Sequence, residues 1–322
     1  MTGYGLLGAG MITRLAVGPA LVASERCHVA HIGARDRARA GDLAAHLGGS
    51  AATAKVSGSY DDVLADPEVD VVYIGLANDA HVPWTLRAIA AGKHVLCEKP
   101  LGLGAAEVAT AFDAADAAGV ALVEASWYRW HPRTRAAEAL LGGERATSVD
   151  AGFVFQRDAS PFFLPGGYRD DPTKGGGALY DVGCYALSAA VWAGAADVTP
   201  EAVDVRRSPT GVDVMTDARL RSPTCEVRLR AAFDEPARQW LDIATPTRRI
   251  SFTHPVFTAT ARDPASLEVD GEPSRPFDPV DPYLLMVDAV AGRAAGGHDW
   301  VVPRADSEAV ARLIDAIAAS MG

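Results

Sequence analysis

Two groups of residues have the types and the spacing that chemistry on a bound ligand would need. The first is the stretch HVLCEKPLG, residues 94–102, an apolar strand that stops on Glu98 and Lys99. Pro100 restricts the backbone directly behind them, so the direction of Lys99 is constrained. The carboxyl end of a parallel strand is where open sheets bind ligands, which favours a functional lysine. An ordinary surface ion pair between Glu98 and Lys99 is the alternative.

The second group lies in GGGALYDVGCYAL, residues 175–187. Asp181 and Tyr185 are four residues apart, so they share one face of the helix predicted to follow the three glycines. They could form a proton-transfer pair in which Tyr185 faces a substrate while Asp181 orients the tyrosine or the substrate. A buried hydrogen bond between the two side chains, without chemistry, is the alternative.

Length and composition bound the class of protein. The chain has 322 residues, with 49% hydrophobic and 22% charged, which suits about two globular domains. Its net charge of −11 argues against general binding to nucleic acid or to an anionic membrane. The four cysteines form no CxxC pair, as expected of packed thiols in the cytoplasm. The apolar start lacks a basic segment and contains Arg14, so we predict neither a targeting segment nor a membrane span.

Apolar strands and Ala-rich helices alternate through the first part of the chain. We predict strands at 4–7, 29–34, 71–76, 95–97 and 121–124, with helices at 37–47, 82–91 and 105–118 between them. This alternation predicts an α/β domain, a Rossmann doubly wound parallel sheet, over residues 1–125.

Strands dominate the second part, residues 126–322. They are predicted at 149–155, 203–207, 218–220, 226–232, 240–243 and 249–252. A glycine-rich loop and helix are predicted at 175–193, and closing helices at 283–292 and 305–318. The pattern predicts an α+β domain with a mostly antiparallel open sheet and helices on one face.

The turn after the first strand, GLLGAGMIT, is typical of dinucleotide binding. Gly8 and Gly10 supply the first two glycines of a G-x-G-x-x-G turn, which lets a pyrophosphate approach the backbone at a helix N-terminus. Met11 and Ile12 belong to the same turn, while Thr13 replaces the third glycine and leaves close packing of helix against strand open. A tight turn without a ligand is the alternative.

The end of the second strand, IGARDRAR, predicts which dinucleotide binds. Where NAD-binding folds carry a carboxylate, this chain has Ala34 followed by Arg35, with Arg37 and Arg39 nearby. A guanidinium suits the 2′-phosphate of NADP, because arginine can hold it with two hydrogen bonds. We therefore predict NADP in preference to NAD. A solvated helix start, or Asp36 as the ribose-binding acid, is the alternative.

Together these motifs resemble the Gfo/Idh/MocA family of oxidoreductases over nearly the whole chain. The resemblance lies in the glycine turn, Asn78-x-x-His81, HVLCEKPL, YRWHP (128–132), GGGALYDVGCY and PARQWL. The order of EKP and GGGAL-x-D-V-G-x-Y is specific. Tyr185 stands where many members carry histidine, so the chain is similar to the branch of dihydrodiol dehydrogenases, glucose–fructose oxidoreductases and sugar ketoreductases.

The resemblance implies a role for each matching residue. Lys99 would lie near the nicotinamide and the reacting oxygen, where an ammonium stabilises negative charge, and Tyr185 would be the general acid and base beside Asp181. The cofactor cleft would be lined by Gly8, Gly10, Met11, Ile12, Ala34, Arg35, Arg39, Leu76, Asn78, His81, Glu98 and Lys99. Substrate contacts are expected from Tyr128, Arg129, His131 and Arg169, with a structural role as the alternative for the first three.

The resulting hypothesis is an NADP(H)-dependent oxidoreductase, without a metal, that interconverts alcohol and carbonyl on a sugar-like or cyclic polyol substrate. Other enzyme hypotheses change the substrate: a nucleotide-sugar ketoreductase, a cyclic dihydrodiol dehydrogenase or an imine reductase. A non-catalytic ligand sensor on the same fold is a hypothesis of another class. The second domain would bind the substrate. Because exposed sheet faces in this family commonly pack against a partner subunit, the same domain would form a homo-oligomer, a dimer or a tetramer.

Overall fold

The computed structural model describes residues 1–160, 163 and 166–321. They form two compact units, the first made of Met1–Gly102, Ala106–Trp127 and Tyr283–Arg304. The second contains Leu103–Ala105, Tyr128–Pro282 and the chain from Ala305 onward. The predicted boundary between residues 125 and 126 lies close to the passage at Trp127. The return of Tyr283–Arg304 to the first unit is not part of that prediction.

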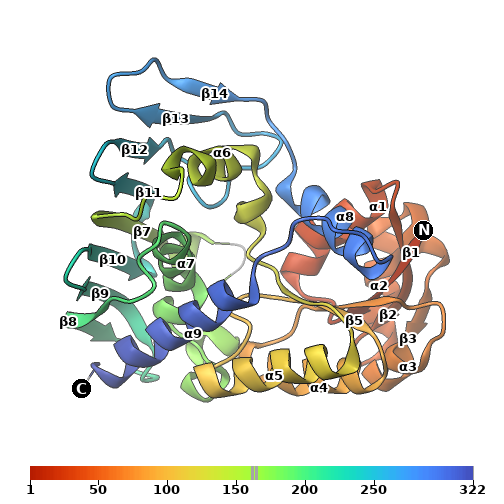
Figure 1. Cartoon of the computed structure of the whole chain (residues 1–322). Coiled ribbons are helices and arrows are strands. Elements are labelled where there is room, and N and C mark those ends of the chain that lie inside the picture. The colour runs from red at the N-terminus through yellow and green to blue at the C-terminus, as the bar shows by residue number, and fades with distance from the viewer. Residues whose placement is uncertain (161–162, 164–165, 322) are drawn as a thin grey trace. The chain divides into compact units, whose positions relative to one another are not determined.

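The first unit is built on a six-stranded parallel sheet in the order β3-β2-β1-β4-β5-β6 (Figure 1). Its strands are β1 (Thr2–Leu7), β2 (Cys27–Gly33), β3 (Lys55–Ser57), β4 (Val71–Ile74), β5 (His94–Cys97) and β6 (Leu122–Glu124). All four residues of β4 are fully buried, which explains why it is a continuous apolar run. The strand order reverses between β1 and β4, and ligands of such sheets bind at this switch point.

Helices connect the strands of the first unit. They are η1 (Thr13–Val17), α1 (Gly18–Ala23), α2 (Arg37–Leu47), η2 (Gly49–Thr53), α3 (Tyr60–Ala65), η3 (Asn78–Ala80), α4 (His81–Ala90), α5 (Ala105–Ala118) and η4 (Trp127–Trp130), which leads out of it. A late helix, α8 (Pro282–Ala294), also belongs here. The hydroxyl of Tyr4 on β1 donates to the carbonyl oxygen of Val287 on α8 at 2.8 Å, so α8 completes the core around β1.

The second unit contains an eight-stranded sheet in the order β14-β13-β12-β11-β7-β10-β9-β8. Its strands are β7 (Ser148–Gln156), β8 (Thr199–Arg207), β9 (Asp213–Arg221), β10 (Glu226–Ala232), β11 (Asp234–Ala244), β12 (Arg249–Phe252), β13 (Ala265–Val269) and β14 (Arg275–Phe277). Strands β7 and β10 pair in parallel and the other neighbours pair antiparallel.

The helices of the second unit lie on one face of this sheet (Figure 1). They are α6 (Pro132–Leu141), η8 (Leu179–Gly183), α7 (Cys184–Trp192) and α9 (Arg304–Ala319), with short 3-10 turns η5 (Arg157–Ala159), η6 (Tyr168–Asp170) and η7 (Pro172–Lys174). Helix α7 packs against β7 and β10. The predicted fold class is therefore confirmed, while β13 and β14, like β3 in the first unit, were not predicted.

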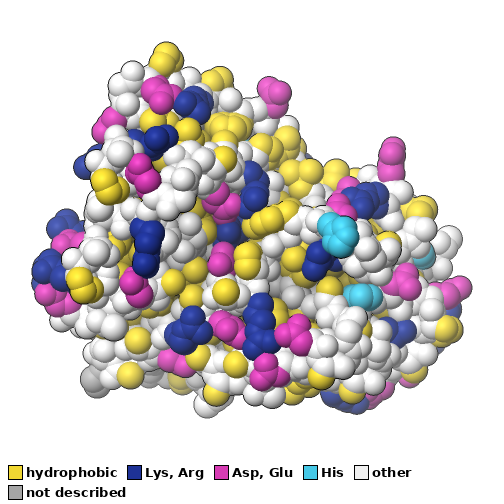
Figure 2. Space-filling view, in the orientation of Figure 1, with side chains coloured by type: hydrophobic (Ala, Val, Ile, Leu, Met, Phe, Trp, Pro, Cys, Tyr) yellow, Lys and Arg dark blue, Asp and Glu magenta, His cyan; other side chains and the backbone are white. Residues whose placement is uncertain are grey.

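The face of the molecule seen in Figure 2 carries no extended basic surface among the residues that the structure describes. Acidic and basic side chains of the described residues are interspersed over the face seen in Figure 2. All four cysteines are buried and carry free thiols. Among residues 1–160, 163 and 166–321, the structure contains no helix with the length and apolar character needed to cross a membrane.

Candidate active site

The glycine turn after β1 has the geometry that a dinucleotide-binding loop needs. Gly8 adopts a φ of 104°, and a Cβ there would lie 2.6 Å from the carbonyl oxygen of Gly75, so a larger residue would be strained. A Cβ at Gly10 would lie 3.7 Å from the same oxygen, an ordinary contact. Intramolecular packing therefore does not require Gly10 to be glycine, whereas a pyrophosphate approaching the backbone would.

Thr13 occupies the position of the third glycine and is fully buried. A Cβ at Gly18 would lie 2.5 Å from the Thr13 carbonyl oxygen, and one at Gly75 would lie 2.9 Å from the Thr13 Oγ1. The first contact lies within the helix itself, whereas the second shows that Gly75, directly after β4, allows the threonine to pack closely against the end of that strand. Met11 and Ile12 are half-buried in the turn before it.

The end of β2 offers guanidinium groups, while its carboxylate is engaged in a helix cap. Ala34 is buried, and Asp36 is the N-cap of α2, where its Oδ1 accepts a hydrogen bond of 2.9 Å from the backbone N–H of Arg39. The side chains of Arg35 and Arg39 are exposed. Burial raises the pKa of Tyr60 on α3, and both guanidiniums oppose this rise, so they lie near its hydroxyl. Tyr60 was not predicted as a cofactor-site residue, although it follows β3 at the same edge of the sheet.

Two buried carboxylates hold the turn after β5. Glu98 accepts a hydrogen bond of 3.0 Å from the hydroxyl of Tyr73 on β4, and Glu124 at the end of β6 accepts one of 3.0 Å from the backbone N–H of Leu101. Burial, together with Glu98, raises the pKa of Tyr73 well above its ordinary value, so Tyr73 remains a donor. The half-buried Lys99 therefore extends from a well-anchored turn at the carboxyl end of β5.

His81 joins the loops that follow β4 and β5. Its ring is fully buried, with Nδ1 2.8 Å from the carbonyl oxygen of Pro100 and Nε2 3.2 Å from that of Leu76. Burial lowers the pKa of His81, so the neutral ring can donate to one of these two oxygens. Asn78 is buried in the same loop. His81 thus shapes the loops at the carboxyl edge, where the predicted cofactor residues lie.

In the second unit, Asp181 and Tyr185 lie where the helical pitch changes. Asp181 belongs to the π-helical turn η8, and Tyr185 to the first turn of α7. The prediction of one regular helix is therefore wrong for its first turn. A π turn is wider than an α turn and is frequent at functional sites. Both side chains are largely buried.

Asp181 is paired with Arg169, the fourth predicted substrate residue. The Arg169 Nε donates to Asp181 Oδ2 at 2.8 Å. Burial alone would lower the pKa of Arg169, but the Asp181 carboxylate, with smaller contributions from Tyr168 and Tyr185, raises it above its ordinary value. A carboxylate paired in this way is a poor proton acceptor and a good orienting group. The guanidinium also brings positive charge close to Tyr185.

The ring of Tyr185 is fixed by an aromatic cluster. Its centroid lies 5.8 Å from that of Tyr128, 5.6 Å from Phe153 and 5.7 Å from Phe257. Such tilted contacts add to the stability of the packing and restrict the ring's orientation. Phe153 lies on β7, half-buried, and is a site neighbour that the sequence did not identify.

Tyr128 and His131 are engaged within the second unit. The Tyr128 hydroxyl donates to Ser188 Oγ at 2.9 Å and accepts from Trp192 Nε1 at 3.2 Å. His131 is the N-cap of α6, and its Nδ1 accepts a hydrogen bond of 3.1 Å from the backbone N–H of Arg133. Burial, and then the charge of Arg133, lowers the pKa of His131 to about 4. These contacts favour the structural alternative for both residues.

Arg129 also belongs to the interior of the second unit. Its side chain is 3% exposed and forms ion pairs with Glu138 and, at 3.0 Å, with Asp306. These two carboxylates offset its buried charge. Arg129 thus joins α6 to α9, and this arrangement too favours the structural alternative.

The glycine turn at the switch point and the strand order of the first unit define a dinucleotide-binding Rossmann protein. A family model described as "Oxidoreductase family, NAD-binding Rossmann fold" (GFO_IDH_MocA) matches residues 2–126. With the relative described next, which aligns along almost the whole chain, this match shows that the chain belongs to the Gfo/Idh/MocA family of oxidoreductases.

Relatives cover nearly the full length. D-xylose 1-dehydrogenase (NADP(+)) 2 of Haloferax volcanii is 38% identical over 327 residues, which cover 98% of this chain and 95% of that protein. Human trans-1,2-dihydrobenzene-1,2-diol dehydrogenase is 29% identical over 350 residues, covering 99% of this chain and 96% of that protein. KijD10, a 3-ketoreductase from Actinomadura kijaniata in complex with NADP and TDP-benzene, matches with a TM-score of 0.88 and 26% identity, covering 99% and 98% of the two chains.

These findings confirm the predicted family and the oxidoreductase class. The chain is an oxidoreductase, and its first unit has the NAD-binding Rossmann fold. The prediction of NADP agrees with the cofactor named for the Haloferax enzyme and for the KijD10 complex.

Proposed function

We propose that the chain is an NADP(H)-dependent oxidoreductase that interconverts alcohol and carbonyl on a sugar-like or cyclic polyol substrate. The observation that carries this proposal is the placement of Tyr185, whose ring is fixed by aromatic neighbours and whose helix α7 continues from the turn η8 that carries Asp181, the partner of Arg169. A phenol can transfer a proton. A carboxylate accepts and a guanidinium donates hydrogen bonds, so the pair suits a substrate with several hydroxyl groups.

The residues at the carboxyl edge of the first unit fit NADP. The backbone at Gly10 would approach the pyrophosphate, and Arg35 and Arg39, beside Tyr60, would hold the 2′-phosphate. The alternative in which Asp36 binds the ribose is disfavoured, because its carboxylate already caps α2. Bound NADP would supply or accept the hydride.

Proton transfer and charge stabilisation fall to side chains of this chain. In reduction, Tyr185 would donate its phenolic proton to the carbonyl oxygen, and in oxidation the phenolate would remove the hydroxyl proton. The Lys99 ammonium would stabilise the negative charge on that oxygen and favour the ionised phenol. Asp181, held by Arg169, would orient a substrate hydroxyl and not act as the base.

An aldose is the first substrate to test, because the Haloferax relative named for D-xylose is 38% identical along 98% of this chain. The reaction would oxidise a lactol to a lactone. A cyclic dihydrodiol and a nucleotide-linked ketosugar are the second candidates, suggested by the names of the human relative and of KijD10.

The experiment is a turnover screen that follows the absorbance of the reduced nicotinamide. Each dinucleotide, NADP or NAD, is offered with D-xylose, other aldoses, inositols, cyclic dihydrodiols, nucleotide sugars and cyclic imines. Turnover of an aldose or cyclic polyol with NADP supports the proposal. Turnover of imines alone, or ligand binding without any turnover, contradicts it.

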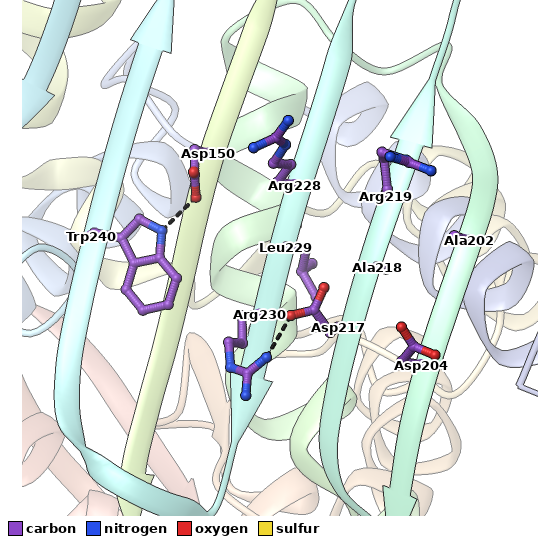
Figure 3. A pocket seen from close by; sticks show the side chains of 10 residues that line it. All are labelled: Asp150, Ala202, Asp204, Asp217, Ala218, Arg219, Arg228, Leu229, Arg230 and Trp240. Atoms are coloured by element: carbon purple, nitrogen blue, oxygen red, sulfur yellow. Dashed lines mark hydrogen bonds and ion pairs between the residues drawn. The ribbon is translucent and has the colours of Figure 1, made fainter.

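We also propose that the chain forms a cytoplasmic homo-oligomer through the sheet face opposite the helices. Figure 3 shows this face, where the Trp240 indole lies over Gly152 and donates to Asp150 at 2.6 Å. Arg230 pairs with Asp217 at 2.6 Å on the same face. A two-fold interface must complement itself, and a face with an indole and charges of both signs can do so. Light scattering that finds a monomer at every concentration and at low salt would refute this.

A further inference from the structure

A buried carboxylate on β9 satisfies the first backbone N–H of the helix that carries Tyr185. Asp213 is 5% exposed, and its Oδ2 accepts a hydrogen bond of 2.8 Å from the N–H of Leu179, the first residue of η8. The residue before it, Ala178, has no side chain that could cap the helix. The N–H groups of a first turn have no partner within their own helix. Asp213 on strand β9 therefore supplies the cap from outside the helix.

The same carboxylate fixes the glycine turn that leads into the helix. Gly177 has a φ of 113°, and a Cβ there would lie 1.9 Å from Asp213 Oδ1, so the glycine backbone lies directly against the carboxylate. The N–H of Gly177 donates to the carbonyl oxygen of Arg169 at 3.1 Å, and its own carbonyl accepts from the N–H of Asp181 at 3.1 Å. One glycine thus links Asp213 to both partners of the Asp181–Arg169 pair.

We infer that Asp213 is a positioning residue for the proposed proton transfer, acting through Gly177 and the N–H of Leu179 on the direction of η8 and α7. The inference rests on the proposed function, because its consequence for turnover requires Tyr185 and Asp181 to act on substrate. A displacement of the first turn would move Asp181 directly and Tyr185 through the helix. Misplacement of a reacting group by about 1 Å can cost on the order of 100-fold in rate.

The role requires a hydrogen-bond acceptor and not a negative charge. Burial raises the pKa of Asp213, while the hydrogen bonds from Thr216 and from Leu179 oppose this rise. The Thr216 hydroxyl donates to the same Oδ2 at 2.7 Å. Asparagine can place its amide oxygen at that position and accept both hydrogen bonds. Alanine cannot, and it leaves the N–H of Leu179 without its partner.

The test compares Asp213→Ala and Asp213→Asn with two controls in the turnover assay. We expect kcat to fall about 10- to 100-fold in Asp213→Ala, with Asp213→Asn close to wild type and dinucleotide affinity unchanged in both. Thr216→Val removes the second donor but not the cap, and Leu267→Ala lowers stability at the fully buried Leu267 on β13; both should keep kcat. If Asp213→Ala keeps kcat within about twofold, or Leu267→Ala loses as much, the inference is wrong.

Hydrogen exchange separates this inference from the proposed function. The amides of 179–185 should exchange faster in Asp213→Ala than in wild type, and at the wild-type rate in Asp213→Asn. This measurement needs no substrate, so it tests the positioning even if wild type turns over nothing in the screen, which would contradict the proposed function alone. If Asp213→Ala does not fold, Asp213→Ser, whose hydroxyl stands one bond closer to the backbone, replaces it. Unchanged exchange in the variant lacking the cap overturns the inference.

Discussion

Replacing His131 by asparagine tests whether this residue belongs to the fold or to substrate binding. In the structure its Nδ1 caps α6 by accepting from the N–H of Arg133, and asparagine can cap a helix in the same way. Burial, with the Arg133 charge second, lowers the pKa of His131 from 6.5 to about 4. The unfolded chain therefore binds a proton at this residue in a pH range where the folded chain does not.

The sign of the effect follows from that lowered pKa. The stability contributed by the neutral ring is present above pH 6.5 and is lost as the pH falls toward about 4. A gap of about 2.5 pKa units corresponds to about 3 kcal/mol at 1.36 kcal/mol per unit. Wild type should thus lose about 2–3 kcal/mol more than His131→Asn between about pH 7 and pH 4.5.

Urea unfolding at both pH values measures this difference. The other histidines with a lowered pKa, His81 and His94, titrate in both proteins, so the comparison isolates His131. Activity near neutral pH should be unchanged. Equal loss of stability in the two proteins would refute the reasoning. A folded variant with a tenfold loss of activity would instead return His131 to the substrate site.

The remaining predictions concern the proposed chemistry and the cofactor. Tyr185→Phe should lower kcat by ~10²–10⁴ with dinucleotide affinity nearly unchanged, measured by steady-state kinetics and by titration; a wild-type rate would assign the proton transfer to another group. Lys99→Ala should lower turnover strongly with an unchanged circular dichroism spectrum, and full turnover would leave Lys99 as a surface ion pair. Arg35→Ala should weaken NADP binding about 10- to 150-fold, for a charged contact of roughly 1.5–3 kcal/mol, and hardly change NAD binding. Arg39→Ala should add to the loss, while Arg37→Ala is the matched control. Tighter binding of NAD than NADP by wild type would contradict the cofactor proposal.

Five strands of the parallel sheet could be predicted because they are short apolar runs, whereas the edge strand β3, Lys55–Ser57, has an exposed lysine and no such signal. The strands β13 and β14 could not, since each is short and lies in a region rich in proline, glycine and charge. Helix α8 was predicted as a helix, but its membership of the first unit depends on contacts such as Tyr4 with Val287, 283 residues apart.

The site was predictable where the chemistry is local and not where it depends on distant partners. The glycine turn and the arginines near the end of β2 are contiguous in the sequence. The burial of Arg129 depends on Asp306, 177 residues away, and the cap of Leu179 on Asp213, 34 residues away. Nothing near Arg129 or Asp213 in the sequence indicates these pairings. The π turn at Asp181 likewise packs against β7, β9 and β10, contacts that no local pattern encodes.

The return of Tyr283–Arg304 to the first unit has a consequence for how the protein is made. On the ribosome the six parallel strands emerge first, and all of them are complete by Glu124. The helix that covers Tyr4 emerges almost three hundred residues after it, together with Tyr283, whose ring stacks on Trp127 at 4.3 Å. Until then the nascent first unit has neither partner, and the whole second sheet is synthesised in the interval. The dinucleotide-binding half therefore cannot be completed until the second sheet has been translated, although its own strands are translated first.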